Sequence, residues 1–278
     1  MTVLEILLIF TLYFLFTFRP KERAEDAAAY TNRGTAWDAR REYDKAIADK
    51  AIGLDPKEAV AYFNRGTAWS AKLEYDKAIA DYDKAIRLDP KYAFAYNNRG
   101  NIWRAQGEYD KAIADYDKAI ELDPKEAVAY LNRGNTWRAR REYDKAIADY
   151  DKAIELDPKD AWAYNNRGLA WSARQEYDKA ITDYDKAIEL DPKEAVAYLN
   201  RGLAWSARQE YDKAIADYDK AIALDPKDAA AAAYFASLNR DLAPWSTQRR
   251  TGPPPELPAG FGLPLIAEYV QQGDRTRP

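Results

Sequence analysis

The stretch AVAYLNRGNTWRARREYDKAIADYDKAIELDPK, residues 127–159, decides the fold because close copies of it recur along the chain. Its tripeptide Asn-Arg-Gly begins at Asn32, Asn64, Asn98, Asn132, Asn166 and Asn200. The first step between these copies is 32 residues, and the four that follow are 34 residues each. A fixed period of this length is the signature of a repeat array and predicts a chain of stacked supersecondary units.

The pattern inside one unit predicts two helices. Tyr130, Gly134 and Trp137 lie at i, i+4 and i+7, which places them on one face of a helix. A second apolar stripe follows the turn: Ala146, Tyr150, Ala153 and Leu156. Pro158 then ends the unit. Because one unit cannot bury its own apolar faces, neighbouring units must stack.

This unit resembles the tetratricopeptide repeat, in which an aromatic, a glycine and an aromatic mark the first helix. An alanine, an aromatic and an alanine mark the second helix, and a proline follows. The resemblance extends from Ala27 to about Leu242. It implies an all-α, right-handed superhelical solenoid of helix–turn–helix repeats whose first helices line a concave groove. It also implies a protein or peptide partner, without indicating which one.

Composition limits the classes of function. Charged residues are 32% of the chain, yet the net charge is only −4 because opposite signs alternate, as in Glu142, Asp144 and Lys145. This alternation indicates a solvated outer face and not the basic stripe that nucleic acid requires, so we expect no nucleic-acid partner. The chain has no Cys and no His, and it has no Gly-rich phosphate loop. We therefore expect no enzymatic activity, no cofactor and no metal.

Residues 1–23 form a hydrophobic N-terminal segment with a basic flank. Only Thr11 and Thr17 are polar between Ile6 and Phe18, and basic residues follow from Arg19. The run is marginal for a spanning helix, which needs about 20 apolar residues. We expect residues 1–18 to anchor the chain in a membrane, with the repeats in the cytoplasm. The alternative is a cleaved or mis-started leader, which leaves a cytoplasmic or an exported protein.

The remaining segments follow from the repeats. Six repeats are expected over residues 27–227, a capping helix over 228–242, and a Pro-rich, disordered tail over 243–278. Docking of the tail's apolar part, 263–270, onto a groove is the alternative. The first repeat lacks two residues where later copies have Asp-Tyr, which displaces its second apolar stripe by about 200° and predicts a weak end of the array.

The junctions and turns also carry predictions. Asp157 is expected to cap the next helix, with Pro158 in its first turn and Asp160 at the positive end of its dipole. The turn inside each unit has glycine only once. The turn residues are Arg41, Leu73, Gly107, Arg141, Gln175 and Gln209. A left-handed conformation would cost each non-glycine residue roughly 1 kcal/mol.

Aromatic residues fall into two groups. The recurring ones are expected in the core: Trp37, Trp69, Trp103, Trp137, Trp171 and Trp205, with Tyr62, Tyr96, Tyr130, Tyr164 and Tyr198. Phe94 and Trp162 replace the valine of other repeats, two residues before the recurring tyrosine. In the family this flank points into the groove, so both are candidate binding anchors. The alternative is an apolar exchange at a half-buried site.

Asparagines recur two residues after each of these tyrosines, although Asn is a mediocre helix former. An amide can match one peptide group of an extended ligand; the alternative is that Asn braces a neighbouring helix. Arg104 and Arg138 would add a partner for a ligand carboxylate. The predicted site is Phe94, Asn97, Asn98, Asn101, Arg104, Asn132, Asn135, Arg138, Trp162, Asn165 and Asn166. The arginine that follows each recurring Asn is expected to pack its stem and to reach nearby carboxylates.

We thus predict an adaptor that binds a peptide segment or a partner surface in its groove. The expected ligand is an extended segment with apolar side chains and an acidic residue. The lysines with which some family members clamp a terminal carboxylate are absent here. The alternative function is structural: a spacer, or a self-associating and membrane-tethered array without a specific peptide ligand.

Overall fold

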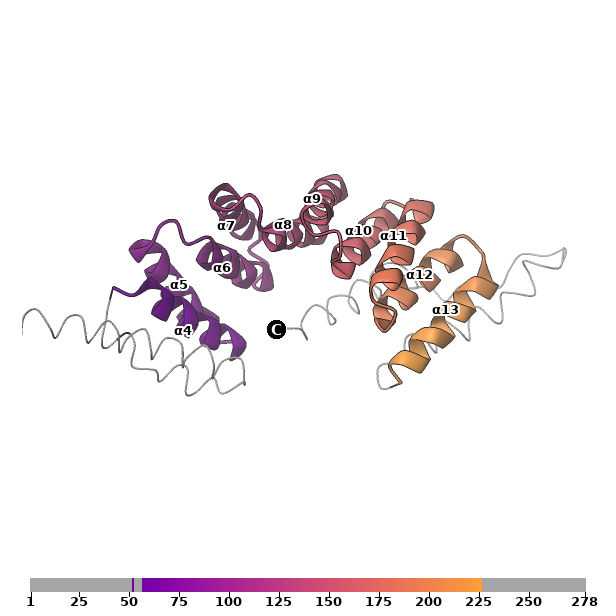
Figure 1. The fold of residues 1–278 in the computed structure, drawn as a ribbon, viewed down its shortest axis with the longest axis horizontal. Coiled ribbons are helices and arrows are strands. Elements are labelled where there is room, and N and C mark those ends of the chain that lie inside the picture. The colour runs from indigo at the N-terminus through magenta and orange to yellow at the C-terminus, as the bar shows by residue number, and fades with distance from the viewer. Residues whose placement is uncertain (1–51, 53–56, 227–278) are drawn as a thin grey trace, which may run out of the picture. The chain divides into compact units, whose positions relative to one another are not determined.

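The computed structural model describes Ile52 and residues 57–226, and every regular element in this part of the chain is an α-helix (Figure 1). The helices are α4 (Ala59–Ala71), α5 (Tyr75–Leu88), α6 (Ala93–Ala105), α7 (Tyr109–Leu122), α8 (Ala127–Ala139), α9 (Tyr143–Leu156), α10 (Ala161–Ala173), α11 (Tyr177–Leu190), α12 (Ala195–Ala207) and α13 (Tyr211–Leu224). They form five of the six expected helix–turn–helix units, so the predicted all-α repeat fold is confirmed.

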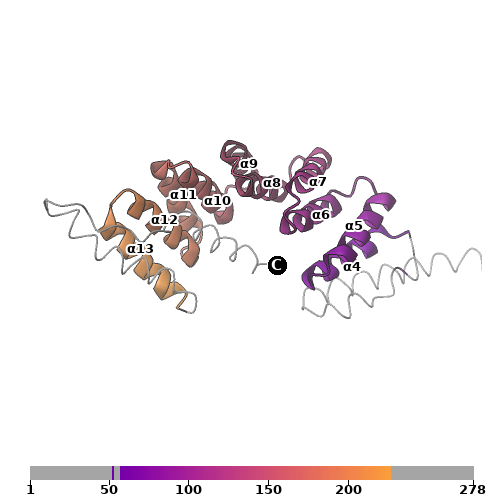
Figure 2. The same ribbon diagram turned by 180° about the vertical axis from the view of Figure 1, so that it is seen from behind.

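The chain divides into two compact units, residues 1–124 and 125–278. In the first unit, α4 pairs with α5, α6 pairs with α7, and α5 also packs against α6 (Figures 1 and 2). In the second unit the pairs are α8–α9, α10–α11 and α12–α13, with α9 against α10 and α11 against α12. Within the units, α5, α9 and α11 therefore each pack on the first helices of their own repeat and of the next.

A tyrosine of the second helix forms the centre of each repeat. Tyr184 of α11 is only 1% exposed and lies against Gly168 of α10. A Cβ atom at Gly168 would come within 2.6 Å of the Tyr184 ring, so only glycine allows this approach. Ala180 and Ala187 complete the buried stripe of α11. The same large side chain is fully buried in every described repeat, at Tyr82, Tyr116, Tyr150, Tyr184 and Tyr218.

The recurring aromatics of the first helix are less buried than expected. Trp171 is only half-buried, and its ring is flanked by Lys179 at 4.2 Å and by Arg174 at 5.4 Å. Tyr164 is also half-buried, with the guanidinium of Arg167 at 5.6 Å from its ring centre. These rings pack against the buried clusters, as Trp69, Trp137, Trp171 and Trp205 do, but one side of each stays partly exposed. Cation–π contacts cover their outer faces.

The junction between repeats differs from the expected one. Asp157 follows the last residue of α9, and its carboxylate accepts a hydrogen bond from the Lys159 N–H at 3.1 Å. The residue that caps α10 is Asp160, which accepts from the Trp162 N–H at 2.9 Å. The prediction that Asp157 caps α10 was therefore wrong, because Pro158 belongs to a turn between the helices and not to the first turn of α10.

The turns within repeats adopt the left-handed conformation. The φ angles are 61° at Leu73, 62° at Arg141, 63° at Gln175 and 63° at Gln209, and 78° at Gly107. In each case a backbone N–H closes the turn; the Gln175 N–H, for example, donates to the Ser172 carbonyl at 2.9 Å. Four of the five described turns thus carry a strain of roughly 1 kcal/mol each.

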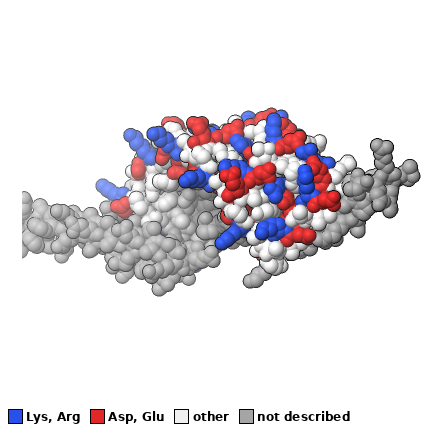
Figure 3. Space-filling model, turned by 45° about the vertical axis from the view of Figure 1, so that its right-hand side comes forward, with Lys and Arg blue, Asp and Glu red and all other residues white. Residues whose placement is uncertain are grey.

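The recurring arginines reach carboxylates, as predicted. Arg167 donates through Nε and Nη2 to the two oxygens of Asp183, at 2.8 and 2.6 Å, and through Nη1 to Asp151 of the preceding repeat at 2.6 Å. Arg99 and Arg201 bridge two repeats in the same way. The outer surface of the described residues carries interspersed positive and negative charges (Figure 3).

Several predictions fall on residues that the structure does not describe. The N-terminal segment 1–23, the first repeat with its missing pair of residues, the capping helix 228–242 and the tail 243–278 lie outside the described residues. Among the helices from α4 to α13, none is long and apolar enough to cross a lipid bilayer.

Candidate functional site

An exposed apolar position recurs in the first turn of the first helices. Val60 is 39% exposed, Phe94 52% and Val128 49%. Among the described residues the only other large apolar side chain exposed to this degree is Leu73, in a turn. Trp162 occupies the same repeat position as these three residues and is half-buried. Each first helix thus begins with an apolar side chain accessible to a partner.

In the first unit, the predicted site residues divide into exposed and internally bonded groups. Phe94 is exposed, and Arg104 is half-buried. Asn97 is buried, and its amide donates to Asn98 Oδ1 at 3.2 Å. Asn101 Oδ1 accepts from the Tyr116 hydroxyl at 2.7 Å. The amide oxygen of Asn101 therefore has a structural partner in the second helix of its own repeat.

The second unit shows the same division. Asn135 is buried, and its Oδ1 accepts from the Tyr150 hydroxyl at 2.8 Å. Asn165 and Asn166 are both buried, and Asn165 Oδ1 accepts from the Asn200 amide at 2.9 Å. The remaining three predicted residues of this unit are half-buried: Asn132, Arg138 and Trp162.

Asn200 shows what the sequence patterns left out. It belongs to the recurring asparagines, yet it was not placed in the site. The structure pairs it with Asn165, which lies one repeat earlier and at the neighbouring repeat position. Only a repeat with Asn in place of Leu131 or Leu199 can form this bond, so the presence of Asn165 was the available signal.

Tyr92 is a second residue that sequence reasoning missed. Its ring centre lies 5.0 Å from that of Phe63 and 6.4 Å from that of Phe94, the latter in an edge-on arrangement. Burial raises the pKa of Tyr92 to about 12, and the neighbouring carboxylates of Asp89 and Glu58 add to the shift. The hydroxyl therefore stays protonated and can donate a hydrogen bond. Its signal was an aromatic where other repeats have an acidic residue.

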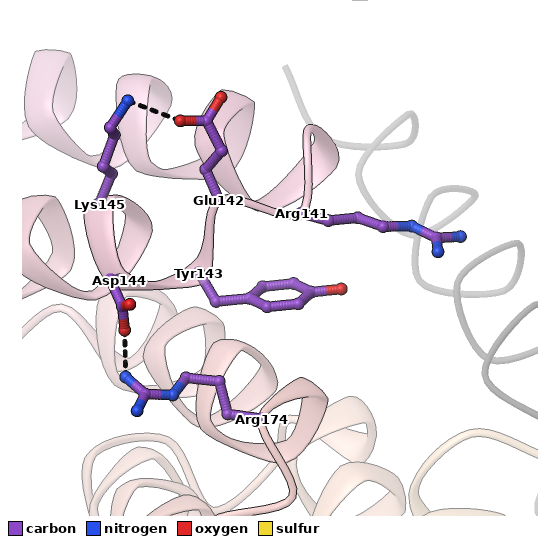
Figure 4. A pocket seen from close by; sticks show the side chains of 6 residues that line it. All are labelled: Arg141, Glu142, Tyr143, Asp144, Lys145 and Arg174. Atoms are coloured by element: carbon purple, nitrogen blue, oxygen red, sulfur yellow. Dashed lines mark hydrogen bonds and ion pairs between the residues drawn. The ribbon is translucent and has the colours of Figure 1, made fainter.

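An open cavity of about 360 Å³ lies beside the turn between α8 and α9. It is lined by Arg141, Glu142, Tyr143, Asp144, Lys145 and Arg174 (Figure 4). Lys145 pairs with Glu142 at 2.6 Å, and Arg174 pairs with Asp144. These opposite charges compensate one another, so the cavity favours no one sign of ligand. Within residues 57–226, no group of acidic side chains is arranged to hold a metal ion.

Stacked helical hairpins that expose apolar side chains at a recurring position define an α-helical repeat protein of the protein-binding class. Family models described as Tetratricopeptide repeat match residues 59–92, 93–126, 161–194 and 195–228, and a further one matches 115–148. A model described as TPR repeat matches 134–171. The chain belongs to the tetratricopeptide repeat family and is a protein–protein interaction scaffold.

Solved structures agree with this assignment. YrrB, described as a TPR protein with an unusual peptide-binding site, is 27% identical over 66% of this chain and 95% of its own, with a TM-score of 0.54. MamA is 31% identical over 59% of this chain and 96% of its own, with a TM-score of 0.54. Pseudomonas aeruginosa pilF, at 20% identity, 79% and 98% coverage and a TM-score of 0.68, shows the fold alone. A comparison with curated proteins found no match.

Proposed function

We propose that this scaffold binds an extended peptide segment along the face that the beginnings of the first helices form within a unit. The observation that carries the proposal is the recurrence of one exposed apolar position, at Val60, Phe94 and Val128. Sizeable exposed apolar patches commonly mark interaction sites, and stacking brings the same position of successive repeats onto neighbouring helices. The exposed surfaces of the second helices, in contrast, carry interspersed positive and negative side chains.

The proposed ligand has apolar side chains and one acidic residue. Val128 and Trp162 would contact its apolar side chains, and the Asn132 amide would bind its backbone. Arg138 would pair with its carboxylate, because a guanidinium binds a carboxylate in a fixed geometry. Each amide contact is worth about 0.5–1.5 kcal/mol, so several contacts must act together. The counterparts in the first unit are Phe94, Asn98 and Arg104.

The test compares two pairs of substitutions in the second unit of the full-length chain. Val128→Glu with Trp162→Ala alters the proposed face. Ala148→Glu with Thr182→Glu alters exposed positions of α9 and α11 and serves as the matched control. A partner captured by the wild-type chain and then purified should lose at least tenfold in affinity for the first pair only. Equal losses, or no loss, would contradict the proposed face.

Substitution of single asparagines distinguishes a role in ligand binding from a role in bracing the helices. Asn132→Ala should weaken binding of that partner, because the half-buried Asn132 amide is proposed to bind its backbone. Asn135→Ala should lower stability instead, since it removes the acceptor of the buried Tyr150 hydroxyl. If no partner is captured and light scattering shows a mass that grows with concentration, the structural alternative replaces the peptide-binding function.

Membrane attachment through residues 1–18 completes the proposal, on the strength of the apolar run alone. Deleting Met1–Phe18 should move the chain from the membrane fraction to the soluble fraction without a change in helical content. Recovery of the full-length chain as a soluble monomer would rule out the anchor.

A further inference from the structure

An aromatic surface in the first unit differs from the corresponding position of every other described repeat. It consists of Val60 and Phe63 on α4 and of Tyr92 and Phe94 at the start of α6, and we call it the α6 aromatic surface. Val60 and Phe63 lie one helical turn apart, α4 contacts α6, and the ring of Tyr92 lies between those of Phe63 and Phe94. Rings in this arrangement offer flat apolar faces to a ligand that is itself flat and apolar.

The position that precedes α6 differs from that of the later repeats. Tyr92 occupies the position where they have Glu126, Asp160 and Glu194. Glu126 and Asp160 accept a backbone N–H of their own helix, whereas α4, α6 and α12 have no side-chain capping bond. The start of α6 thus has an aromatic ring where the later repeats have a carboxylate.

The chain itself contains a segment with complementary chemistry. Residues 249–258 read Arg-Arg-Thr-Gly-Pro-Pro-Pro-Glu-Leu-Pro. Consecutive prolines favour the polyproline II conformation, which aromatic surfaces recognise at a low entropic cost. Proline has no N–H, so such a backbone offers only carbonyl acceptors. The protonated hydroxyl of Tyr92 is a suitable donor for one of them.

Charge also favours this segment. The carboxylates of Glu58 and Asp89 act on Tyr92, and Arg249 and Arg250 precede the prolines. Basic and apolar parts of the segment therefore match acidic and aromatic parts of the surface.

We propose that the α6 aromatic surface binds residues 249–258 of a second copy of this chain as an extended, proline-rich segment. Every molecule carries both halves of the contact, so self-association needs no other component. A second copy can deliver the segment without restraint from the residues that link it to the repeats. The α6 aromatic surface shares Val60 and Phe94 with the proposed peptide-binding face, but it includes none of the residues that test that face in the second unit.

The natural absence of cysteine makes this contact testable with single-cysteine variants of the full-length chain. Val60→Cys protein is mixed with Ala259→Cys protein under mild oxidation, and the yield of disulfide-linked heterodimer is measured. The matched control replaces the first variant by Val128→Cys, which has the same repeat position and similar exposure but a capping acid, Glu126. We expect at least a fivefold higher yield for Val60→Cys. Equal yields would overturn the proposal.

Further substitutions test which residues are responsible for the yield of the disulfide-linked heterodimer. Tyr92→Ala with Phe94→Ala in the first chain should reduce it to the control level, as should Pro253→Ser, Pro254→Ser and Pro255→Ser in the second. Arg249→Glu with Arg250→Glu should reduce it and should also remove its dependence on salt. A yield that survives these changes contradicts the proposed contact. A chain with both cysteines that links only to itself would overturn the assignment to a second copy.

Discussion

Two kinds of polar contact inside the second unit differ in how constant they are from repeat to repeat. The ion pairs between helices are the same in each repeat, with Arg133, Arg167 and Arg201 each bidentate to an aspartate. The partner of the buried tyrosine hydroxyl changes instead. Tyr150 donates to Asn135, whereas the Tyr184 hydroxyl pairs with Ser172 at 3.1 Å.

The difference shows which buried groups restrict the sequence. Asp183 is 4% exposed, and a buried carboxylate without its cation costs several kcal/mol, so the arginine recurs in every described repeat. A neutral hydroxyl needs only one hydrogen bond, which side chains from two positions of the first helix can supply. The first helix therefore has Asn135 with Arg138 in one repeat and Leu169 with Ser172 in the next.

Removal of the invariant cation should have the largest effect. Arg167→Leu leaves Asp183 buried without its bidentate partner, and we expect a loss of about 3–5 kcal/mol in the free energy of unfolding. Arg174→Leu is the control, because its partner Asp144 is mostly exposed, and it should cost less than about 1 kcal/mol. Chemical denaturation of both variants makes the comparison, and equal losses would show that burial does not decide the effect.

The loss in Arg167→Leu should depend on pH. Burial raises the pKa of Asp183, while Arg167 lowers it. Without Arg167 the folded-state pKa therefore rises further above its unfolded value. A carboxyl with a raised folded pKa gains relative stability as pH falls, because the folded state binds the proton first. The stability of the variant should therefore lie closer to that of the wild type at acidic pH than at pH 7. A difference that grows on acidification would contradict this sign.

The hydroxyl region should be interchangeable between repeats. Asn135→Leu removes the acceptor of the Tyr150 hydroxyl and should cost about 1–3 kcal/mol. Adding Arg138→Ser reproduces the Leu-Ser combination of α10 and should recover at least half of the loss. Arg138→Ala in place of Arg138→Ser supplies no hydroxyl partner and is the control. A double-mutant cycle measures the coupling, and additive losses would mean that the two combinations are not equivalent.

Deletion of one hydroxyl should have the smallest effect. Tyr184→Phe leaves Ser172 free to turn toward solvent, because Ser172 is only half-buried, and should cost about 0.5–1.5 kcal/mol. Tyr150→Phe should cost more, since it strands the buried Asn135 oxygen. Thermal unfolding of the two variants gives the order. The reverse order would mean that the bond to the half-buried Ser172 contributes more stability than the bond to the buried Asn135.

Much of the fold could be predicted because its signals are local and recur. The period, the two apolar stripes and the turn position predict helical hairpins, and the family resemblance is confirmed by matches over residues 59–228. The sequence analysis assigned the N-cap of α10 to Asp157, because an Asp-Pro pair suggests a helix start wherever it occurs. Only the backbone path shows that the turn continues and that Asp160 is the cap.

The candidate site was less predictable. A pattern shows that Asn135 and Asn132 share a helix, but it does not show which of them meets a tyrosine hydroxyl from the next helix. Tyr92 occurs once, so no repeat statistics indicate its role, and its neighbours Phe63 and Phe94 come from two different helices. The exposure of Phe94 agrees with its choice as a candidate anchor, and its binding role stays a prediction.

The sequence by itself determined the repeat length, the helix pairs and the position of the turn within each repeat, because each depends on residues close in the chain. The tertiary structure alone decided how the polar groups share partners between helices: Asn135 with Tyr150, Asn165 with Asn200, and Arg167 with two aspartates. Hydrogen bonds need donor and acceptor within about 3 Å, and such distances between helices follow from packing. Periodicity places a residue on a face; packing decides what that face meets.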